Sequence, residues 1–190
     1  MRKQHRRLGT IRVIGGKWRG RKITFQSHAT LRPTPDRVRE TLFNWLASSI
    51  QGAKCLDLFA GSGILGFEAL SRGSSTVTAV EEHPKSCQSM LQAKEELYAN
   101  LTVVQADVKR WLEKSNNELF NVVFLDPPYH SNLWLESIQK LQSNRLVVQN
   151  GFVYVETNVL LKNEQFPIGC ELYRMKKAGN VYSYLIRIRS

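Results

Sequence analysis

The segment that decides the fold is Asp57-Leu-Phe-Ala-Gly-Ser-Gly-Ile-Leu-Gly-Phe-Glu-Ala-Leu-Ser-Arg-Gly73. The mostly apolar run just before it, residues 53–59, predicts a short strand. Apolar residues then recur at helical spacing as far as Gly73, a residue type that commonly ends helices. The glycines therefore fall on a strand-to-helix turn. A backbone without side chains lets a ligand approach there, and the N–H groups of the helix start favour a negative group or a lone pair.

The glycine spacing Gly61-Ser-Gly-Ile-Leu-Gly66 matches the pattern of dinucleotide-binding proteins, but two features argue against a dinucleotide. Asp57 lies four residues before the first glycine, where it would repel a pyrophosphate and attract a cation. The later tetrapeptide Asp126-Pro-Pro-Tyr129 has no use in hydride transfer. S-adenosylmethionine carries a sulfonium and an ammonium as well as a carboxylate, so it suits an acidic, glycine-lined turn.

The chain has 190 residues, 42% of them hydrophobic, which is typical of one soluble domain with a substantial core. No apolar run approaches the roughly 18–20 residues of a membrane span. The basic N-terminus has no apolar region after it, so no secretory signal is expected. The three cysteines are scattered without a Cys-x-x-Cys motif, which favours free thiols in a reducing cytoplasm over disulfides or a metal site.

Positive charge is concentrated at the front of the chain. The net charge is +11, and residues 1–40 alone hold twelve Lys and Arg against two acidic residues, a net of +10. A solvated basic tail is one interpretation, but interleaved glycines, β-forming residues and Trp18 favour binding to nucleic acid. The residues expected to contact RNA are Arg2, Lys3, Arg6, Arg7, Lys17, Trp18, Arg19, Arg21 and Lys22.

Residues 10–25 predict a β-hairpin with one apolar and one cationic face, because two alternating runs flank the glycine-rich turn 15–20. Thr34-Pro-Asp36 then predicts a helix start with Thr34 as N-cap. Arg37 and Arg39 in this helix are expected to point away from its buried stripe.

From residue 53 onward, predicted strands and helices alternate. This alternation predicts an α/β fold, a Rossmann-like, seven-stranded, mostly parallel, doubly wound sheet with an antiparallel edge, to which the N-terminal β-hairpin is added. The parallel strands are predicted over residues 54–59, 76–81, 101–107, 120–126 and 151–156, and the last two strands form a hairpin around residues 178–180.

Acidic residues end the first four of these strands, namely Asp57, Glu81, Asp107 and Asp126. Ligands of such sheets bind outside the carboxyl ends of the strands, so the four carboxylates predict one shared site. Glu81 is placed to accept both ribose hydroxyls, and the adjacent Glu82 is the alternative residue for this contact. Asp107 is placed to accept from an adenine amino group, with backbone near Val108 available for the ring nitrogens.

The tetrapeptide Asp126-Pro-Pro-Tyr129 suits methyl transfer to an exocyclic amine. The Asp126 side chain and the Pro127 carbonyl can accept the two amine hydrogens, which leaves the nitrogen lone pair aimed at the methyl group. Pro127 and Pro128 fix φ and hold these acceptors rigid, and Tyr129 offers a face for stacking a flipped base. The alternative is a plain Pro-Pro turn after a buried strand.

Together, the glycine turn, the acidic strand ends and the tetrapeptide resemble the class I S-adenosylmethionine-dependent amino-methyltransferases. Three further segments, Arg32–Trp45, Leu65–Gly73 and Gly15–Gly20, are similar to the bacterial small-subunit rRNA methyltransferase D family. The resemblance covers nearly the whole chain and is weakest around residues 158–170.

This resemblance implies methylation by S-adenosylmethionine of N2 of guanine 966 in 16S rRNA. The substrate would be the small ribosomal subunit or an assembly intermediate in the cytoplasm, with no metal and no membrane. We expect an RNA-binding extension over residues 1–30 and a methyltransferase domain over residues 31–190. Expected catalytic residues are Asp126, Pro127, Pro128 and Tyr129, and expected cofactor-binding residues are Asp57, Phe59, Gly61, Ser62, Gly63, Glu81, Asp107, Val108 and Asp126.

Three other functions are compatible with parts of this pattern. N6-methylation of adenine in nucleic acid uses the same kind of tetrapeptide, which does not itself name the base. A glutamine methyltransferase is less compatible with the basic front of the chain. A non-catalytic RNA binder in ribosome assembly would have no reason to keep the acidic strand ends.

Overall fold

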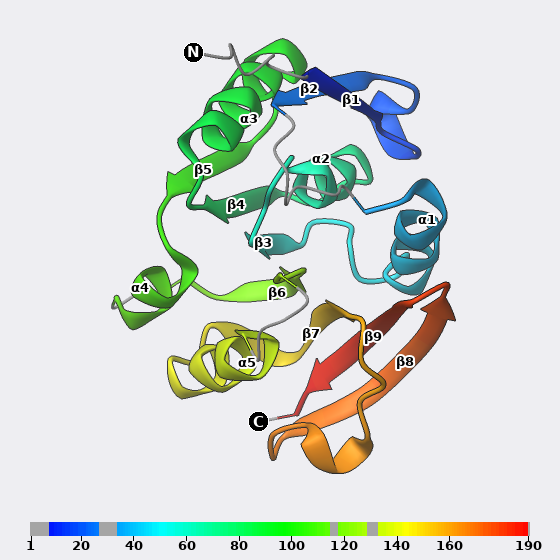
Figure 1. Cartoon of the computed structure of the whole chain (residues 1–190), viewed down its shortest axis with the longest axis vertical. Helices are drawn as coiled ribbons and strands as arrows, with labels where there is room; N and C mark the ends of the chain where they lie inside the picture. Colours follow the sequence, from blue (N-terminus) through cyan, green and yellow to red (C-terminus); the bar gives the residue numbers. More distant parts are fainter. Residues whose placement is uncertain (1–7, 27–33, 115–117, 129–132, 190) are drawn as a thin grey trace, which may run out of the picture.

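The computed structural model describes residues 8–26, 34–114, 118–128 and 133–189. Within these residues, seven strands form one sheet in the order β5-β4-β3-β6-β7-β9-β8, and β1 pairs with β2 in a separate hairpin (Figure 1). Neighbouring strands from β5 to β7 are parallel, and β9 is antiparallel to both β7 and β8. The predicted α/β fold with its antiparallel edge is therefore confirmed. The strands are β1 Leu8–Arg12, β2 Lys22–Gln26, β3 Lys54–Leu58, β4 Thr76–Glu81, β5 Leu101–Gln105, β6 Phe120–Leu125, β7 Val147–Thr157, β8 Cys170–Ala178 and β9 Val181–Ile188.

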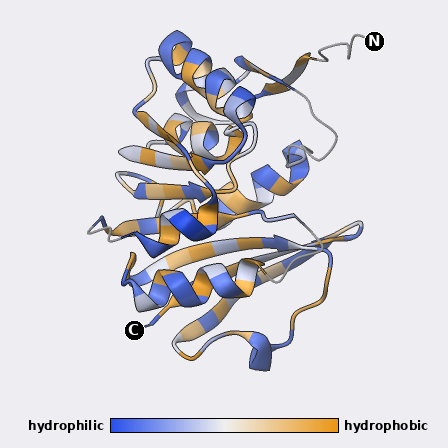
Figure 2. Cartoon of the chain, turned by 60° about the vertical axis from the view of Figure 1, so that its left-hand side comes forward, coloured by the Kyte–Doolittle hydropathy of each residue, from blue (hydrophilic) through white to orange (hydrophobic). Residues whose placement is uncertain are grey.

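Helices cover both faces of the sheet, so its central strands are buried on both sides. Successive residues of β3 point to opposite faces, and Cys55 joins the core on one side while Leu56 joins the core on the other. Figure 2 shows this pattern as apolar central strands between helices of mixed hydropathy. The helices are α1 Asp36–Trp45, α2 Ile64–Ser71, α3 Pro84–Leu97, α4 Val108–Glu113 and α5 Leu133–Ser143, with short 3₁₀ helices η1 Gly16–Trp18 and η2 Asn163–Gln165.

The predicted N-terminal hairpin is present and packs on the main body through its apolar face. Val13, Ile23 and Phe25 are buried, and the first two join the same core as α2 and α3. The tip residue Trp18 is partly buried against this core, and the Lys17 ammonium lies 4.4 Å from the centroid of its ring. The cationic side chains are left on the outer face.

Two local predictions around α1 are wrong. The N-cap position of α1 is Pro35, with no side-chain cap, and Thr34 is buried instead. Arg39, expected in solvent, is fully buried, whereas Arg37 is exposed as predicted. In both cases, tertiary contacts described below have replaced the local preference. No helix in the described ranges is long and apolar enough to cross a membrane.

Candidate active site

The glycine turn leaves β3 in a conformation that most residues avoid. Phe59, Gly61 and Gly63 all have positive φ, at 65°, 55° and 75°. For Phe59 this is a strained state, which proteins retain mainly at functional sites. The Gly63 amide donates to the Ala60 carbonyl at 2.7 Å and closes the turn. The turn therefore presents a tightly folded backbone at the carboxyl edge of β3.

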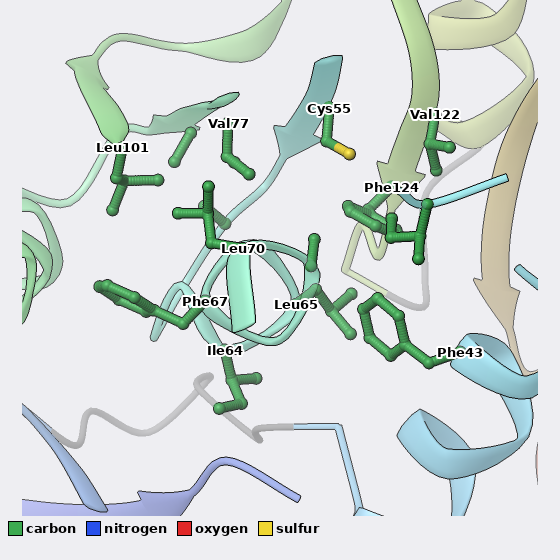
Figure 3. Close-up of a cluster of buried hydrophobic side chains, with 14 of the residues drawn as sticks. Phe43, Cys55, Ile64, Leu65, Phe67, Leu70, Val77, Leu101, Val122 and Phe124 are labelled. Atoms are coloured by element: carbon green, nitrogen blue, oxygen red, sulfur yellow. The ribbon is translucent and has the colours of Figure 1, made fainter. Parts of the chain in front are cut away.

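Helix α2, which follows the turn, is buried along its whole length. Figure 3 shows it nearly end-on, with Leu65 facing Phe43 and Phe124 and with Leu70 facing Val77 and Leu101. A Cβ added to the helix N-cap, Gly63, would lie 2.7 Å from the Met90 sulfur, so this position accepts only glycine without a shift of its neighbours. Packing on all sides thus fixes the turn relative to the sheet.

Glu81 is held in place by two backbone donors. Its two carboxylate oxygens accept from the Gly61 and His83 amides, each at 2.7 Å. Each oxygen keeps a further lone pair, so two ribose hydroxyls can still be accepted. The side chain of Glu81 is buried beside the turn, whereas Glu82 is exposed. This geometry favours Glu81 for the predicted ribose contact.

Asp57 is buried at the base of the turn, where its Oδ2 accepts from the Gly66 amide at 3.2 Å. Burial raises the pKa of its carboxyl to about 8, the hydrogen bond opposes this, and the charges of Asp126 and Glu81 raise the pKa further. The charges of Asp126 and Glu81 thus act on Asp57, and all three carboxyl groups lie at the carboxyl edge of the sheet. Such an acidic group fits the ammonium and sulfonium of S-adenosylmethionine.

Asp107 occupies the next strand end along the edge, because Gln105 of β5 pairs with Glu81 of β4. Its carboxylate is exposed and caps α4, with Oδ1 accepting from the Arg110 amide at 3.0 Å. The adjacent Val108 is buried. Asp107 therefore has a structural role as a cap, and its contact with adenine stays a prediction.

Asp126 follows β6 and belongs to a buried polar cluster that the sequence did not reveal. The hydroxyl of Thr34 is hydrogen-bonded to the carboxyl groups of both Asp126 and Glu156. Burial raises the pKa of both carboxyls, and the charge of Asp126 adds to the effect on Glu156. The Tyr154 hydroxyl lies 2.8 Å from Glu156 Oε1 and 3.1 Å from Ser183 Oγ.

The cluster places one hydroxyl between two carboxyl groups whose pKa values are both raised by burial. A threonine hydroxyl has one hydrogen, so it can donate to only one of the two carboxyl groups. Glu156 lies at the end of β7, so the strand-end rule that selected Asp57 and Asp126 would also have found it.

Some predicted residues lie outside the described part of the chain, and others are at the surface. Tyr129, and with it the stacking role in the tetrapeptide, lies outside the described residues. So does the N-terminal arm with Arg2, Lys3, Arg6 and Arg7. Lys17, Arg19, Arg21 and Lys22 of the hairpin are all exposed.

A buried ion pair connects the hairpin to α2. The Arg39 guanidinium donates to Glu68 Oε2 at 3.0 Å and to the Arg12 carbonyl at 3.0 Å, and both side chains of the pair are fully buried. Glu68 also accepts from the Ile14 amide at 2.9 Å and from Arg72 Nε at 2.8 Å. The helix that begins at the glycine turn therefore also holds the basic hairpin.

Comparison with known proteins identifies the family. The family model described as "Conserved hypothetical protein 95" matches residues 11–187. Ribosomal RNA small subunit methyltransferase D of Escherichia coli K12 is 43% identical over 178 residues, covering 93% of this chain and 89% of the relative. The Buchnera aphidicola (Acyrthosiphon pisum) protein of the same name is 36% identical over 183 residues, 95% and 94% of the two chains. The chain therefore belongs to the family of ribosomal RNA small subunit methyltransferase D.

The comparison with solved structures agrees with this family assignment. The structure described as "Putative methyltransferase yhhF from Escherichia coli" superposes with a TM-score of 0.86 at 42% identity, and the match covers 96% of this chain and 99% of that one. By family and fold, the protein is an S-adenosylmethionine-dependent methyltransferase. Among the described residues, no group of three or more His, Cys, Asp or Glu is arranged to hold a metal ion.

Proposed function

We propose that the protein methylates N2 of a guanine in 16S rRNA in the bacterial cytoplasm, and that the guanine is number 966. The curated relatives are small-subunit rRNA methyltransferases, which supports the class of RNA. The observation that carries the choice of an exocyclic amine is Asp126 with its two following prolines, beside Asp57 and Glu81. Acceptors for amine hydrogens thus stand next to the acidic turn suited to a cationic methyl donor.

The chemistry needs few protein groups. Bound S-adenosylmethionine supplies an electrophilic methyl group on its sulfonium. The amine lone pair forms the new C–N bond, the electrons of the broken C–S bond stay on sulfur, and the nitrogen releases one proton. Asp126 and the Pro127 carbonyl accept the amine hydrogens and orient that lone pair. Because burial raises the pKa of Asp126, its carboxylate can also take the released proton near neutral pH.

Binding of the RNA is assigned to the basic front of the chain. Lys17, Arg19, Arg21 and Lys22 project from the outer face of a hairpin whose inner face is packed on the core. Neutralised phosphates release counterions, so affinity for single-stranded RNA should fall with salt by about 0.7 log units per contact and per tenfold salt. In this proposal the hairpin docks the RNA, and the strand ends carry out the reaction.

The test uses 16S rRNA, either free or in small subunits, that is purified from a strain lacking the protein. This RNA is incubated with the protein and labelled S-adenosylmethionine. Mass spectrometry of the digested RNA should detect one N2-methylguanosine. Detection of N6-methyladenosine instead would replace the proposed base, and absence of any methylated nucleoside from both substrates would overturn the proposal.

Two variants separate cofactor binding from chemistry. Asp126→Ala should abolish turnover while cofactor affinity by calorimetry stays within a few-fold. Glu81→Ala should weaken cofactor binding by about 1.5–3 kcal/mol, since it removes charged hydrogen-bond acceptors. The neighbouring exposed Glu82→Ala is the matched control. Loss of affinity in Glu82→Ala alone would transfer the ribose contact to that residue.

A further inference from the structure

The turn of the β8–β9 hairpin lies at the same edge of the sheet as the candidate active site. Strand β7 runs parallel to β6 and ends beside it at this edge. Because β9 is antiparallel to β7, its first residues lie there too, and β8 returns to that edge with its last residues. The end of β8 and the start of β9 therefore flank the site on the side of β7.

The strand register gives the distance between Asp126 and the end of the β8–β9 hairpin. Leu125 pairs with Val155, so the next residues along β6 and β7 are Asp126 and Glu156. Glu156 pairs with Ser183, and Ser183 pairs with Lys176. Three steps between neighbouring strands separate Asp126 from Lys176, and at about 4.8 Å a step they span about 14 Å. This is within reach of an RNA segment whose target base lies at Asp126.

The hairpin end is basic and aromatic. Residues 172–178 contain Arg174, Lys176 and Lys177, all exposed, and no acidic residue. The Arg174 guanidinium lies 4.4 Å from the ring centroid of Tyr173, and the Lys177 ammonium lies 5.0 Å from that of Tyr182. Basic side chains next to aromatic ones are the combination found in grooves that bind single-stranded nucleic acids.

The charge distribution singles out the same segment. Residues 170–190 hold five Lys and Arg and one Glu, a net charge of +4, whereas residues 41–169 hold ten Lys and Arg against thirteen acidic residues, a net charge of −3. Beyond the N-terminal region, a net positive charge is therefore found only in the C-terminal strands, where Arg174, Lys176 and Lys177 lie in the hairpin end. An acidic middle segment separates the two basic regions.

We propose that the β8–β9 end, defined as Arg174, Lys176, Lys177 and Tyr182, is a second RNA-contact surface. The inference rests on the proposed RNA substrate and adds a contact on the other side of the target base. The N-terminal hairpin packs against α3, the crossover between β4 and β5, whereas β8 is the outermost strand at the opposite end of the sheet (Figure 1). The two basic regions therefore hold the RNA from both sides of the site.

Another role for these lysines is protection of an edge strand, since charged residues on an outer strand discourage pairing with other chains. The distribution of charge along β8 argues against this as the main role. The cations occupy only the half of β8 that ends near the site, and the first half, Cys170–Tyr173, contains Glu171 and no cation. Protection of the edge strand would not require the cations to be gathered in one half of β8. Lys176 additionally donates to Thr41 Oγ1 at 3.0 Å, which ties the hairpin end to α1.

The experiment compares two double charge reversals in the full-length protein. Arg174→Glu with Lys177→Glu changes the proposed surface and spares Lys176. The control, Lys114→Glu with Lys140→Glu, changes the net charge equally at exposed positions at the ends of α4 and α5, which lead back to the opposite edge of the sheet. Binding of a labelled 16S rRNA fragment is measured by fluorescence anisotropy across a salt series, beside thermal unfolding and cofactor affinity.

The surface variant should bind RNA at least about 25-fold more weakly at 0.1 M salt, and its salt slope should be less steep by about 1.4, from two lost phosphate contacts. It should keep its unfolding temperature and cofactor affinity, with KM for RNA raised and kcat retained. Equal RNA affinity of surface and control variants would overturn the inference, and so would increased self-association as the only change. Because the readout is RNA binding, it does not depend on which base is methylated, so failure of the proposed function would appear separately.

Discussion

Substitution of Glu68 by Ala tests whether the buried ion pair holds the hairpin and α2 together. The change leaves the fully buried Arg39 guanidinium with only the partly exposed Asp36 carboxylate, 2.6 Å away, as a charged partner, and it removes the acceptor of the Ile14 amide as well. Breaking a buried pair on one side costs about 3–5 kcal/mol when the remaining charge is left uncompensated, and the retained Asp36 contact places the expected loss toward the lower end of this range. For a chain of this size, such a loss lowers the unfolding temperature by roughly 6–20 °C.

The assay is chemical denaturation followed by intrinsic fluorescence, with Glu136→Ala as the control. Glu136 pairs with Lys109 at 2.6 Å, but both side chains are more than half exposed, so this pair should contribute little. The loss of stability in Glu68→Gln should fall between the losses in Glu68→Ala and Glu136→Ala, since its amide oxygen can still accept from the Ile14 amide and from Arg39. If Glu68→Ala were no more destabilising than Glu136→Ala, the reasoning about the buried pair would be refuted.

Three further outcomes are expected. Asp57→Asn should reduce the pH dependence of stability: an acid whose pKa rises on folding from about 4 to about 8 stabilises the fold fully below pH 4 and loses that contribution toward pH 8. Equal slopes of unfolding free energy against pH in both proteins would contradict this. Gly16→Ala should destabilise more than Gly20→Ala, because both have positive φ but only the former would place a Cβ 1.9 Å from a carbonyl oxygen of α2; equal melting temperatures would exclude the docking contact. Glu156→Gln should likewise reduce the fall in stability between about pH 4.5 and pH 8, because the pKa of this buried carboxyl rises on folding to about 8, and an unchanged slope of unfolding free energy against pH would contradict the buried cluster.

The sheet and three of the four strand-end carboxylates could be predicted together because both depend on local patterns. Short apolar runs alternating with helical spacing specify parallel strands buried on both faces. Parallel strands in turn bring their carboxyl ends to one edge, so Asp57, Glu81 and Asp126 had to meet. Glu156 ends the predicted strand 151–156 and was accessible to the same rule, but the prediction applied the rule only to the first four strands.

The two failures around α1 have a different cause. Thr34-Pro-Asp36 has the composition of a helix start, but the Thr34 hydroxyl is hydrogen-bonded to two carboxyl groups far along the chain instead of capping α1. Arg39 is buried because Glu68 and the Arg12 carbonyl, 29 and 27 residues away, satisfy its donors together with Asp36, which lies three residues earlier in the same helix. Arginine is rarely buried unless it is paired, and no local pattern encodes a partner at that separation.

These long-range contacts give α2 a double role. Its N-terminus fixes the glycine turn, while the Glu68 carboxylate and the Ser71 hydroxyl on its body hold the hairpin, the latter by accepting from the Trp18 amide at 2.9 Å and donating to the Gly15 carbonyl at 2.6 Å. Because one packed helix carries both attachments, the basic hairpin cannot move independently of the turn. In the proposed reaction, RNA docked on the hairpin would thereby be placed at a fixed distance from the methyl donor. A solvated basic tail would not need two hydrogen-bonded anchors on the helix that begins at the glycine turn.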